Sequence, residues 1–123
     1  MSKKTPKKLF IRSKIWLEDE DGNVVFGLGR IKILEAVDRL GSLHAAAKEL
    51  KMGYRAIWGR VKATEERLGA PLLERTIGGS SGGGSRLTPF ARQLLDQFEE
   101  LHQEIREHSD KQFQQCAKLN KLQ

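Results

Sequence analysis

Cysteine is nearly absent from this chain of 123 residues, because Cys116 is the only one. A single cysteine can form neither an intramolecular disulfide nor a cluster of thiolate metal ligands. Its scarcity favours a reducing compartment as the setting of the protein. We interpret Cys116 itself as a bystander thiol rather than as a redox sensor.

Long hydrophobic runs are also lacking. No stretch approaches the ~20 apolar residues that span a membrane, and the lysine-rich start is not followed by the apolar region of a signal peptide. We therefore expect a soluble, cytoplasmic protein without a membrane partner. The sequence also lacks a metal-ligand cluster and paired carboxylates on a common face, and the serines of its glycine-rich stretch have no base beside them, so we expect neither an enzyme nor a cofactor.

Acidic residues are in the minority, with 16 against 22 lysines and arginines and a net charge of +6. The excess is uneven, because residues 30–92 hold twelve basic against six acidic residues, whereas residues 93–123 hold four against six. This distribution favours a polyanion as the partner of the middle of the chain. The length allows one domain plus an extension, with a small core that oligomerisation would help to stabilise.

Residues 41–69 contain two successive helical patterns. Ser42 is a good N-cap, and the apolar residues after it recur at helical spacing as far as about Lys51. After Gly53 a second apolar stripe follows, formed by Tyr54, Ile57, Trp58, Val61 and Leu68. Two helices joined by a short turn that contains glycine predict a helix-turn-helix.

The outer face of the second helix is small and basic. Opposite its apolar stripe lie Ala56, Gly59 and Ala63, and basic residues flank them, namely Arg55, Lys62, Arg60 and Arg67. Small side chains let a helix enter a major groove, while the cations reach phosphates or guanine. Glycine costs about 1 kcal/mol inside a helix, so Gly59 indicates that a partner approaches there. An ordinary solvated face is the alternative interpretation.

The residues before this region predict a tail, a hairpin and a helix. Residues 1–8 have no apolar periodicity and predict a disordered basic tail. Residues 9–26 contain two runs that favour strands, FIRSKIWLE and VVF, separated by the acidic segment DEDGN. This order predicts a β-hairpin with an acidic turn. A helix is predicted over residues 30–40, ended by Gly41. His44 could contact DNA or titrate as a switch, although a partly exposed first-turn histidine is the simpler interpretation.

A second hairpin is predicted after Pro71. Residues 72–77 and 86–88 favour strands, and between them lies a stretch of glycine and serine with little bulk. A hairpin directly after a helix-turn-helix is a wing, whose backbone amides can lie close to phosphates. Its candidate DNA-binding residues are Arg75, Gly79, Ser80, Ser81, Gly82, Gly83 and Arg86. A passive linker is the alternative.

Thr88 and Pro89 predict the start of a last helix. Apolar residues then recur at the spacing of a coiled-coil seam, and we expect them to form a dimer contact; they are Ala91, Leu94, Phe98, Leu101 and Ile105. Packing of the seam onto its own domain is the alternative. Beyond Ile105 the seam positions become polar, so we expect order to fade toward a frayed tail.

Six segments of this chain resemble the N-terminal domain of the ModE family of molybdate-responsive bacterial transcription regulators and, more distantly, LysR-type regulators. They are KIWLE with FGLGR, GSLHAAAKEL, YRAIW, ERLGAPLLER and GGSSGGGSRLTP. The resemblance implies a homodimer on an inverted-repeat operator and a packing role for Trp58. Ala91 departs from the glycine usual in the family. The chain ends where family members continue into a molybdate-binding domain, so we do not expect molybdate to bind here.

The expected fold is mostly α with small β elements: a winged helix-turn-helix over residues 9–88, with an N-terminal hairpin, and a long dimerisation helix over residues 89–123. The expected function is sequence-specific binding of double-stranded DNA by a homodimeric transcription regulator. The alternative is a winged-helix interaction or dimerisation module that does not read DNA. Packing of the small face inside the protein, with Trp58 turned outward, would contradict the regulator hypothesis.

Overall fold

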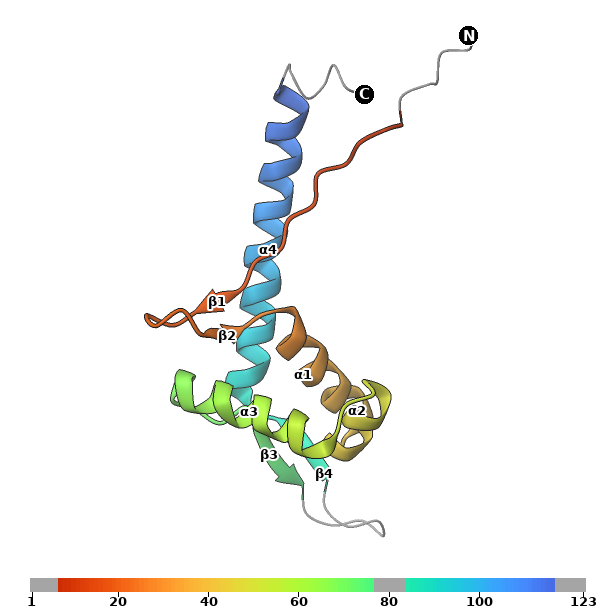
Figure 1. The fold of residues 1–123 in the computed structure, drawn as a ribbon, viewed down its shortest axis with the longest axis vertical. Helices are drawn as coiled ribbons and strands as arrows, with labels where there is room; N and C mark the ends of the chain where they lie inside the picture. The colour runs from red at the N-terminus through yellow and green to blue at the C-terminus, as the bar shows by residue number, and fades with distance from the viewer. Residues whose placement is uncertain (1–6, 77–83, 117–123) are drawn as a thin grey trace. The chain divides into compact units, whose positions relative to one another are not determined.

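The computed structural model describes residues 7–76 and 84–116. They form two compact units, one from Trp16 to Asp96 and the other from the residues up to Ile15 together with those from Gln97 onward. Figure 1 shows the elements, which in chain order are β1 (Leu17–Glu18), β2 (Val24–Phe26), α1 (Leu28–Leu40), α2 (Leu43–Glu49), α3 (Tyr54–Leu68), β3 (Leu73–Thr76), β4 (Gly84–Leu87) and α4 (Pro89–Gln115). The predicted fold class, mostly α with small β elements, is confirmed.

The N-terminal hairpin is present but shorter than predicted. Strands β1 and β2 are antiparallel, with Leu17 opposite Phe26 and a bulge before the next pair. The strand expected over FIRSKIWLE is therefore wrong for the residues before Leu17. Because β2 has only three residues, the chain ahead of β1 has no neighbouring strand, among the described residues, to pair with its backbone groups.

The turn of this hairpin is organised by Asp19. Its Oδ1 accepts hydrogen bonds from the backbone N–H groups of Asp21 and Asn23, each at 2.9 Å. The bond from the Asn23 backbone is the main cause of the lowered pKa of Asp19, and Arg67 lowers this pKa further. Hydrogen bonds to a carboxylate favour its ionised form, so the folded turn stabilises Asp19 as an anion.

We expect Asp19→Asn to weaken the dependence of stability on acid pH. The folded pKa lies below the unfolded value, so the contribution of Asp19 is present above about pH 4 and is lost as pH falls through the lower folded pKa. Thermal unfolding followed by circular dichroism between neutral and acid pH would show a smaller fall in Tm for the variant. Parallel Tm curves for the two proteins would contradict this assignment.

The core of the first unit joins α1, α2 and α3. It contains Ile33, Ala36, Val37, Leu43, Ala46, Ala47, Ile57 and Val61, with Leu50, Met52 and Leu73 packed against it. Helix α1 begins at Leu28 rather than at Arg30, and Gly41 ends it as predicted, with a left-handed φ of 74°. The small side chains of Ala46 and Ala47 let α2 pack closely.

The predicted helix-turn-helix is confirmed in α2 and α3. Ser42 caps α2, because its Oγ accepts the backbone N–H of Ala45 at 3.1 Å. The turn runs from Leu50 to Gly53 and closes with a hydrogen bond from Met52 N–H to the carbonyl of Ala47 at 2.9 Å. This short connection holds α3 directly beside α2 (Figure 1).

Helix α3 is rotated about its axis relative to the expected apolar stripe. Its buried residues are Ile57, Val61 and Thr64. Thr64 is fully buried, and its hydroxyl donates to the carbonyl of Val25 at 3.0 Å and accepts from Arg30 Nε at 3.4 Å. A buried hydroxyl with two partners is stable in an interior. Thr64 therefore occupies a place that hydropathy alone assigns to an apolar residue.

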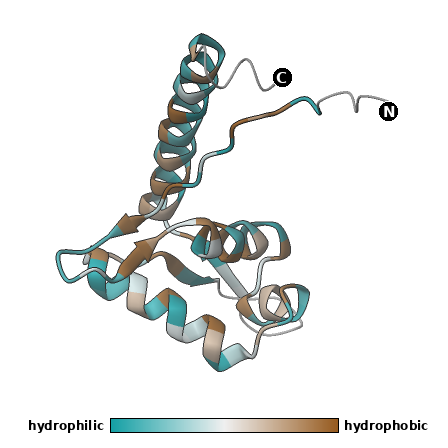
Figure 2. Cartoon of the chain, turned by 45° about the horizontal axis from the view of Figure 1, so that its top comes forward, coloured by the Kyte–Doolittle hydropathy of each residue, from teal (hydrophilic) through white to brown (hydrophobic). Residues whose placement is uncertain are grey.

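Trp58 lies outside the core as a result of this rotation. Its side chain is 48% exposed, although helical spacing in the sequence places it in the apolar stripe. The packing role that the family resemblance implied for Trp58 is wrong. The indole instead lies under a cation, because Lys62 Nζ is 5.6 Å from its ring centre. Figure 2 shows hydrophilic and weakly hydrophobic residues interspersed along α3.

The second hairpin, β3 with β4, is antiparallel and follows α3 directly, as predicted for a wing. Glu65 near the end of α3 ties the two together, since its Oε2 accepts the backbone N–H groups of Leu72 at 2.7 Å and Leu73 at 3.3 Å. The returning strand begins at Gly84, earlier than predicted. The predicted tip residues lie outside the described residues: Gly79, Ser80, Ser81, Gly82 and Gly83.

Helix α4 starts as predicted and ends later. Thr88 Oγ1 accepts the backbone N–H of Ala91 at 3.1 Å, which makes Thr88 the N-cap. The expectation that order fades past Ile105 is wrong, because the helix continues to Gln115. Glutamine, glutamate, lysine and arginine are good helix formers, and Gln103 bonds Glu107 one turn later at 2.9 Å. Helix propensity thus continues after the apolar pattern has ended.

The predicted seam of α4 is only partly available to a second chain. Ala91 is fully buried and Phe98 is 5% exposed within the single chain, which corrects the prediction of dimer contacts for these two residues. Leu101 is 46% exposed, while Leu94 and Ile105 are half-buried. Figure 2 shows hydrophobic and hydrophilic residues alternating along the helix. A dimerisation role for the seam stays a prediction, and it now rests on Leu94, Leu101 and Ile105.

Residues 7–15, the described N-terminal part of the second unit, form no strand and contact α4. His102 Nε2 lies 3.1 Å from the carbonyl oxygen of Ser13. The cations of Lys8 and Arg12 lie 5.3 and 5.2 Å from the ring centre of Phe10. Residues 1–6 of the predicted tail lie outside the described residues.

Candidate nucleic-acid interface

The small face of α3 is open. Ala56 and Gly59 are exposed and Ala63 is half-buried, and a Cβ built on Gly59 would meet nothing within 4 Å. Trp58 is turned outward, but the small residues are not packed inside, so the arrangement that would contradict the regulator hypothesis is not met. Because α3 is rotated, Arg55 and Lys62 lie nearer the centre of the exposed face than expected.

The predicted basic residues of α3 differ in whether they already have a partner within the protein. Within the described ranges, Arg55 and Arg60 have no acidic group within 4 Å. Lys62 Nζ lies 3.2 Å from Glu65 Oε1. Arg67 is held by the first hairpin, since it donates to the carbonyl of Val24 at 3.2 Å and lies 3.7 Å from Asp19 Oδ2. Arg55 and Arg60 are thus the cations best placed for a partner.

A positive cluster lies on one side of α3 and includes Arg30, which the sequence pattern did not indicate. Burial is the main cause of the lowered pKa of Arg30, and the charges of Arg60 and Arg67 lower it further. Like charges this close repel one another, and an anion bound beside them would relieve the repulsion. Only the tertiary structure places Arg30 beside α3, because its hydrogen-bond partner Thr64 is 34 residues away in the chain.

The two wing arginines lie on opposite faces of the hairpin. Arg75 pairs with Ser85 and Glu74 pairs with Arg86 in the antiparallel register, and neighbouring residues of a strand alternate between faces. Arg86 Nε is 2.9 Å from Glu74 Oε1, so its charge is compensated locally. Arg75 has no acidic partner among the described residues and faces the helix-turn-helix.

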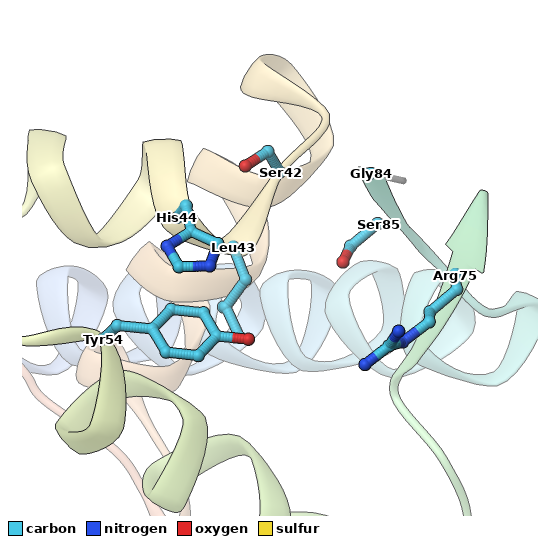
Figure 3. Close-up of a pocket in the computed structure, with 7 residues that line it drawn as sticks. All are labelled: Ser42, Leu43, His44, Tyr54, Arg75, Gly84 and Ser85. Carbon is cyan, nitrogen blue, oxygen red and sulfur yellow. The ribbon is translucent and has the colours of Figure 1, made fainter. Parts of the chain in front are cut away.

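A polar pocket lies between the helix-turn-helix and the wing. We call it the wing pocket; it is lined by Ser42, Leu43, His44, Tyr54, Arg75, Gly84 and Ser85 (Figure 3). The rings of His44 and Tyr54 stack with centres 3.8 Å apart and an angle of 5° between their planes. The sequence assigned Tyr54 to the apolar stripe and did not single out Ser42 or Ser85 as site residues. No local signal could have joined them, because three separate parts of the chain meet here.

Gly84 lets the wing approach the helices. The backbone N–H of Ser85 donates to the carbonyl of Gly41 at 2.9 Å, and that of Gly84 donates to Thr76 Oγ1 at 3.0 Å. A Cβ on Gly84 would lie 2.4 Å from the Gly41 oxygen and 2.8 Å from Thr76 Oγ1. The backbone carbonyl cannot move aside like the end of a flexible side chain, so only glycine fits this contact.

We expect Gly84→Ala to destabilise the protein by about 1–3 kcal/mol, the usual cost of overpacking. Thermal or denaturant unfolding would measure it. Gly29→Ala is the matched control, because a Cβ on Gly29 in α1 meets nothing within 4 Å and alanine is the better helix former. Equal stability of the Gly84 variant and the wild type would show that β4 does not pack this closely on Gly41.

The described part of the chain contains neither a candidate metal site nor a candidate membrane-spanning helix. No group of three or more histidine, cysteine, aspartate or glutamate side chains is arranged there to bind a metal ion. Nor is any helix in that part both long and apolar enough to cross a bilayer.

A helix-turn-helix followed by a two-stranded wing defines the winged helix-turn-helix class. Residues 28–92 match the family model described as "Bacterial regulatory helix-turn-helix protein, lysR family". The match covers more than half of the chain, and the chain belongs to this family. The predicted resemblance to LysR-type regulators is confirmed.

Relatives of known name agree with this assignment. The chain is 38% identical over 80 residues to "Transcriptional regulator ModE" of Haemophilus influenzae, which covers 65% of this chain and 31% of that protein. It is 32% identical over 93 residues to "Molybdenum transport protein ModE" of Azotobacter vinelandii, covering 76% of this chain and 34% of that protein. The chain thus spans about a third of the length of these relatives, and its helix-turn-helix is ModE-like.

A solved structure with the same fold is titled "Crystal structure of CbnR_DBD-DNA complex". It superposes with a TM-score of 0.51 at 27% identity and covers 68% of this chain and 91% of that one. The full CbnR structure, titled as "a LysR family transcriptional regulator", gives a TM-score of 0.50 over 68% of this chain and 27% of that chain. The fold of this chain is therefore that of a LysR-type winged-helix domain.

Proposed function

We propose that this LysR-type regulator binds double-stranded DNA in a sequence-specific manner in the cytoplasm, as a homodimer on an inverted-repeat operator. The observation that carries the proposal is the exposed face of α3, where Gly59 lies between Arg55 and Lys62 with open space above it. A face that is flat and positively charged suits the floor of a major groove. The likeness to a domain whose structure is titled as a DNA complex supports this use of α3.

The residues of α3 divide the work of recognition by their position. Ala56, Gly59 and Ala63 allow close approach to the base edges, and Arg55 projects beside them to donate to guanine. Arg60 and Lys62 contact phosphates on either side. Arg67 is bonded to the first hairpin, so its part is to place the end of α3 and to add positive charge.

The wing contacts the sugar-phosphate backbone of the DNA next to the groove that α3 enters. Arg75 and Arg86 lie at its base, and the tip residues Gly79, Ser80, Ser81, Gly82 and Gly83 bring backbone amides near phosphates. The compensated charge of Arg86 gives it less to contribute than Arg75.

A homodimer would place two copies of α3 in successive major grooves. Leu101 is exposed and Leu94 and Ile105 are partly exposed on α4, which provides an apolar seam for a second copy. Half-sites about one helical turn apart, or a multiple of it, suit such symmetry.

Selection of bound duplexes from a random DNA pool tests the proposal. We expect one motif with two-fold symmetry and a protein to DNA stoichiometry of two to one. A single asymmetric motif bound by one chain would remove the homodimer. Retention without any sequence preference would favour the alternative, a module that does not read DNA.

We expect Arg55→Ala to weaken binding to the selected operator by about 1–3 kcal/mol and to relax preference at one base pair, because the guanidinium reads a base edge. Arg60→Ala should weaken selected and random duplexes alike and lower the salt slope by about 1, as loss of one phosphate contact does. Gel-shift titrations at several salt concentrations measure both. Lys32→Ala, an exposed cation of α1, is the control for the change in net charge. Equal losses of Arg55→Ala on random DNA would make Arg55 a phosphate contact.

A further inference from the structure

The wing pocket gathers hydrogen-bonding groups from three parts of the fold. Ser42 and His44 come from the start of α2, Tyr54 comes from the first turn of α3, and Arg75 and Ser85 come from the two wing strands. Figure 3 shows the stacked rings of His44 and Tyr54 on one side, with Arg75 and Ser85 across from them. The walls of the pocket are therefore polar on every element that forms it.

The wing pocket itself is lined by one arginine and by no carboxylate, and Glu65 and Glu74 line the hollow next to it. Arg75 has no acidic partner among the described residues, and the nearest carboxylate along the strand, Glu74, lies on the other face and pairs with Arg86. A guanidinium in a concave polar site binds an anion with planar, directed donors. Hydroxyl groups around it can donate as well. The chemistry of the pocket suits a phosphate-type oxyanion.

The pocket is held in shape without a ligand. Ser85 is bonded to Gly41, and the close approach of Gly84 keeps β4 against the corner between α1 and α2. The side chain of Ser42 is oriented by its cap bond to Ala45. The stack with His44 orients the phenol ring of Tyr54. Groups that are already ordered lose little conformational entropy on binding.

We propose that the wing pocket binds one phosphodiester group of the DNA backbone, with Arg75 as the charged ligand and the hydroxyls of Tyr54 and Ser85 as donors. The inference rests on the proposed function and names the part of the DNA that this pocket takes. Tyr54 belongs to α3 and Arg75 and Ser85 belong to the wing. A phosphate bound by all three fixes the wing against the same backbone that borders the groove occupied by α3.

Neutral backbone substitution tests the contact. A set of operator duplexes carries a single methylphosphonate linkage at each position in turn, and wild-type affinity for each is measured by gel shift. We expect one position in each half-site at which the methylphosphonate lowers wild-type affinity about tenfold. On the duplex modified at that position, Arg75→Ala should bind less than about twofold more weakly than wild type. Arg86→Ala is the matched control from the same hairpin, and its loss should add in full to that of the methylphosphonate.

Two milder variants keep the test independent of folding. Tyr54→Phe retains the stacked ring and loses the hydroxyl, and Arg75→Lys retains the charge and loses the fork of donors. Both variants should bind the unmodified operator more weakly than wild type and have an unchanged Tm. On the duplex with the methylphosphonate at the position coupled to Arg75, Tyr54→Phe should bind as tightly as wild type. A Tyr54→Phe deficit that persists there would exclude its hydroxyl from the contact.

Free phosphate ions are the other source of the same chemistry. Tm is measured without DNA while chloride is exchanged for phosphate at constant ionic strength. A rise for wild type but not for Arg75→Ala, with no methylphosphonate position coupled to Arg75, would overturn the backbone assignment in favour of a free anion. Unchanged Tm together with one coupled position supports the proposal. Binding of the operator without any coupled position overturns this inference alone, whereas failure to bind any selected duplex overturns the proposed function.

Discussion

Gly59→Leu is expected to remove most operator binding while leaving the protein at least as stable as the wild type. A leucine side chain at this position fills the space that a base edge would occupy, so affinity should fall about a hundredfold, the order of two lost base contacts at about 1–3 kcal/mol each. In the protein alone a Cβ at Gly59 meets nothing within 4 Å. Because glycine is about 1 kcal/mol worse than other residues inside a helix, leucine should raise the free energy of unfolding slightly.

The measurements are a gel-shift titration on the selected operator and denaturant unfolding of the free protein. Gly29→Leu is the matched control, since Gly29 lies in an exposed stretch of α1 where a Cβ also meets nothing within 4 Å. It should show a similar or smaller gain in stability with operator affinity unchanged. Full operator affinity of the Gly59 variant would mean that α3 does not enter the groove by this face.

Ile57→Ala is expected to cost about 2–5 kcal/mol of stability, whereas Trp58→Ala should cost about 1 kcal/mol or less. The two residues are adjacent, but Ile57 is fully buried in the cluster shared by α1, α2 and α3, and Trp58 is half exposed. The loss at Ile57 combines lost burial with a cavity. Against a typical total of about 5–15 kcal/mol, it would leave the domain marginal.

Urea unfolding measures this contrast, through shifts in the midpoint at unchanged slope. Ile57→Val is the graded control, with an expected cost of about 0.5–1.5 kcal/mol. A larger loss at Trp58 than at Ile57 would place the indole in the core and reverse the rotation of α3 described above.

The chemical content of the candidate interface could be predicted from the sequence. Gly59 between flanking cations is evident from helical spacing, and the rotation of α3 does not bury it. Which cations are available could not be predicted. Arg67 is committed because the hairpin places Asp19 and the Val24 carbonyl beside it, more than 40 residues away in the chain. Such pairings depend on how distant segments pack.

The wing pocket shows the same division. The start of α2 was predicted from Ser42, and the wing was predicted from its strands and turn residues. That Tyr54 and Arg75 line one site follows only from the packing of β4 on the corner at Gly41. Nothing in the neighbouring residues of either side chain encodes the other.

By itself, the sequence determined the end of α1, the starts of α2 and α4, and the presence of a hairpin before α1 and another after α3. These features depend on caps, turns and spacing within a few residues, such as Ser42, Gly41 and Thr88 with Pro89. Only the tertiary structure decided how α3 is turned. The hydroxyl of Thr64 finds its acceptor on Val25, 39 residues earlier, and this buried hydrogen bond places Thr64 inside and Trp58 outside. Local interactions determine that a helix forms, but the segments that pack against it determine which of its faces is buried.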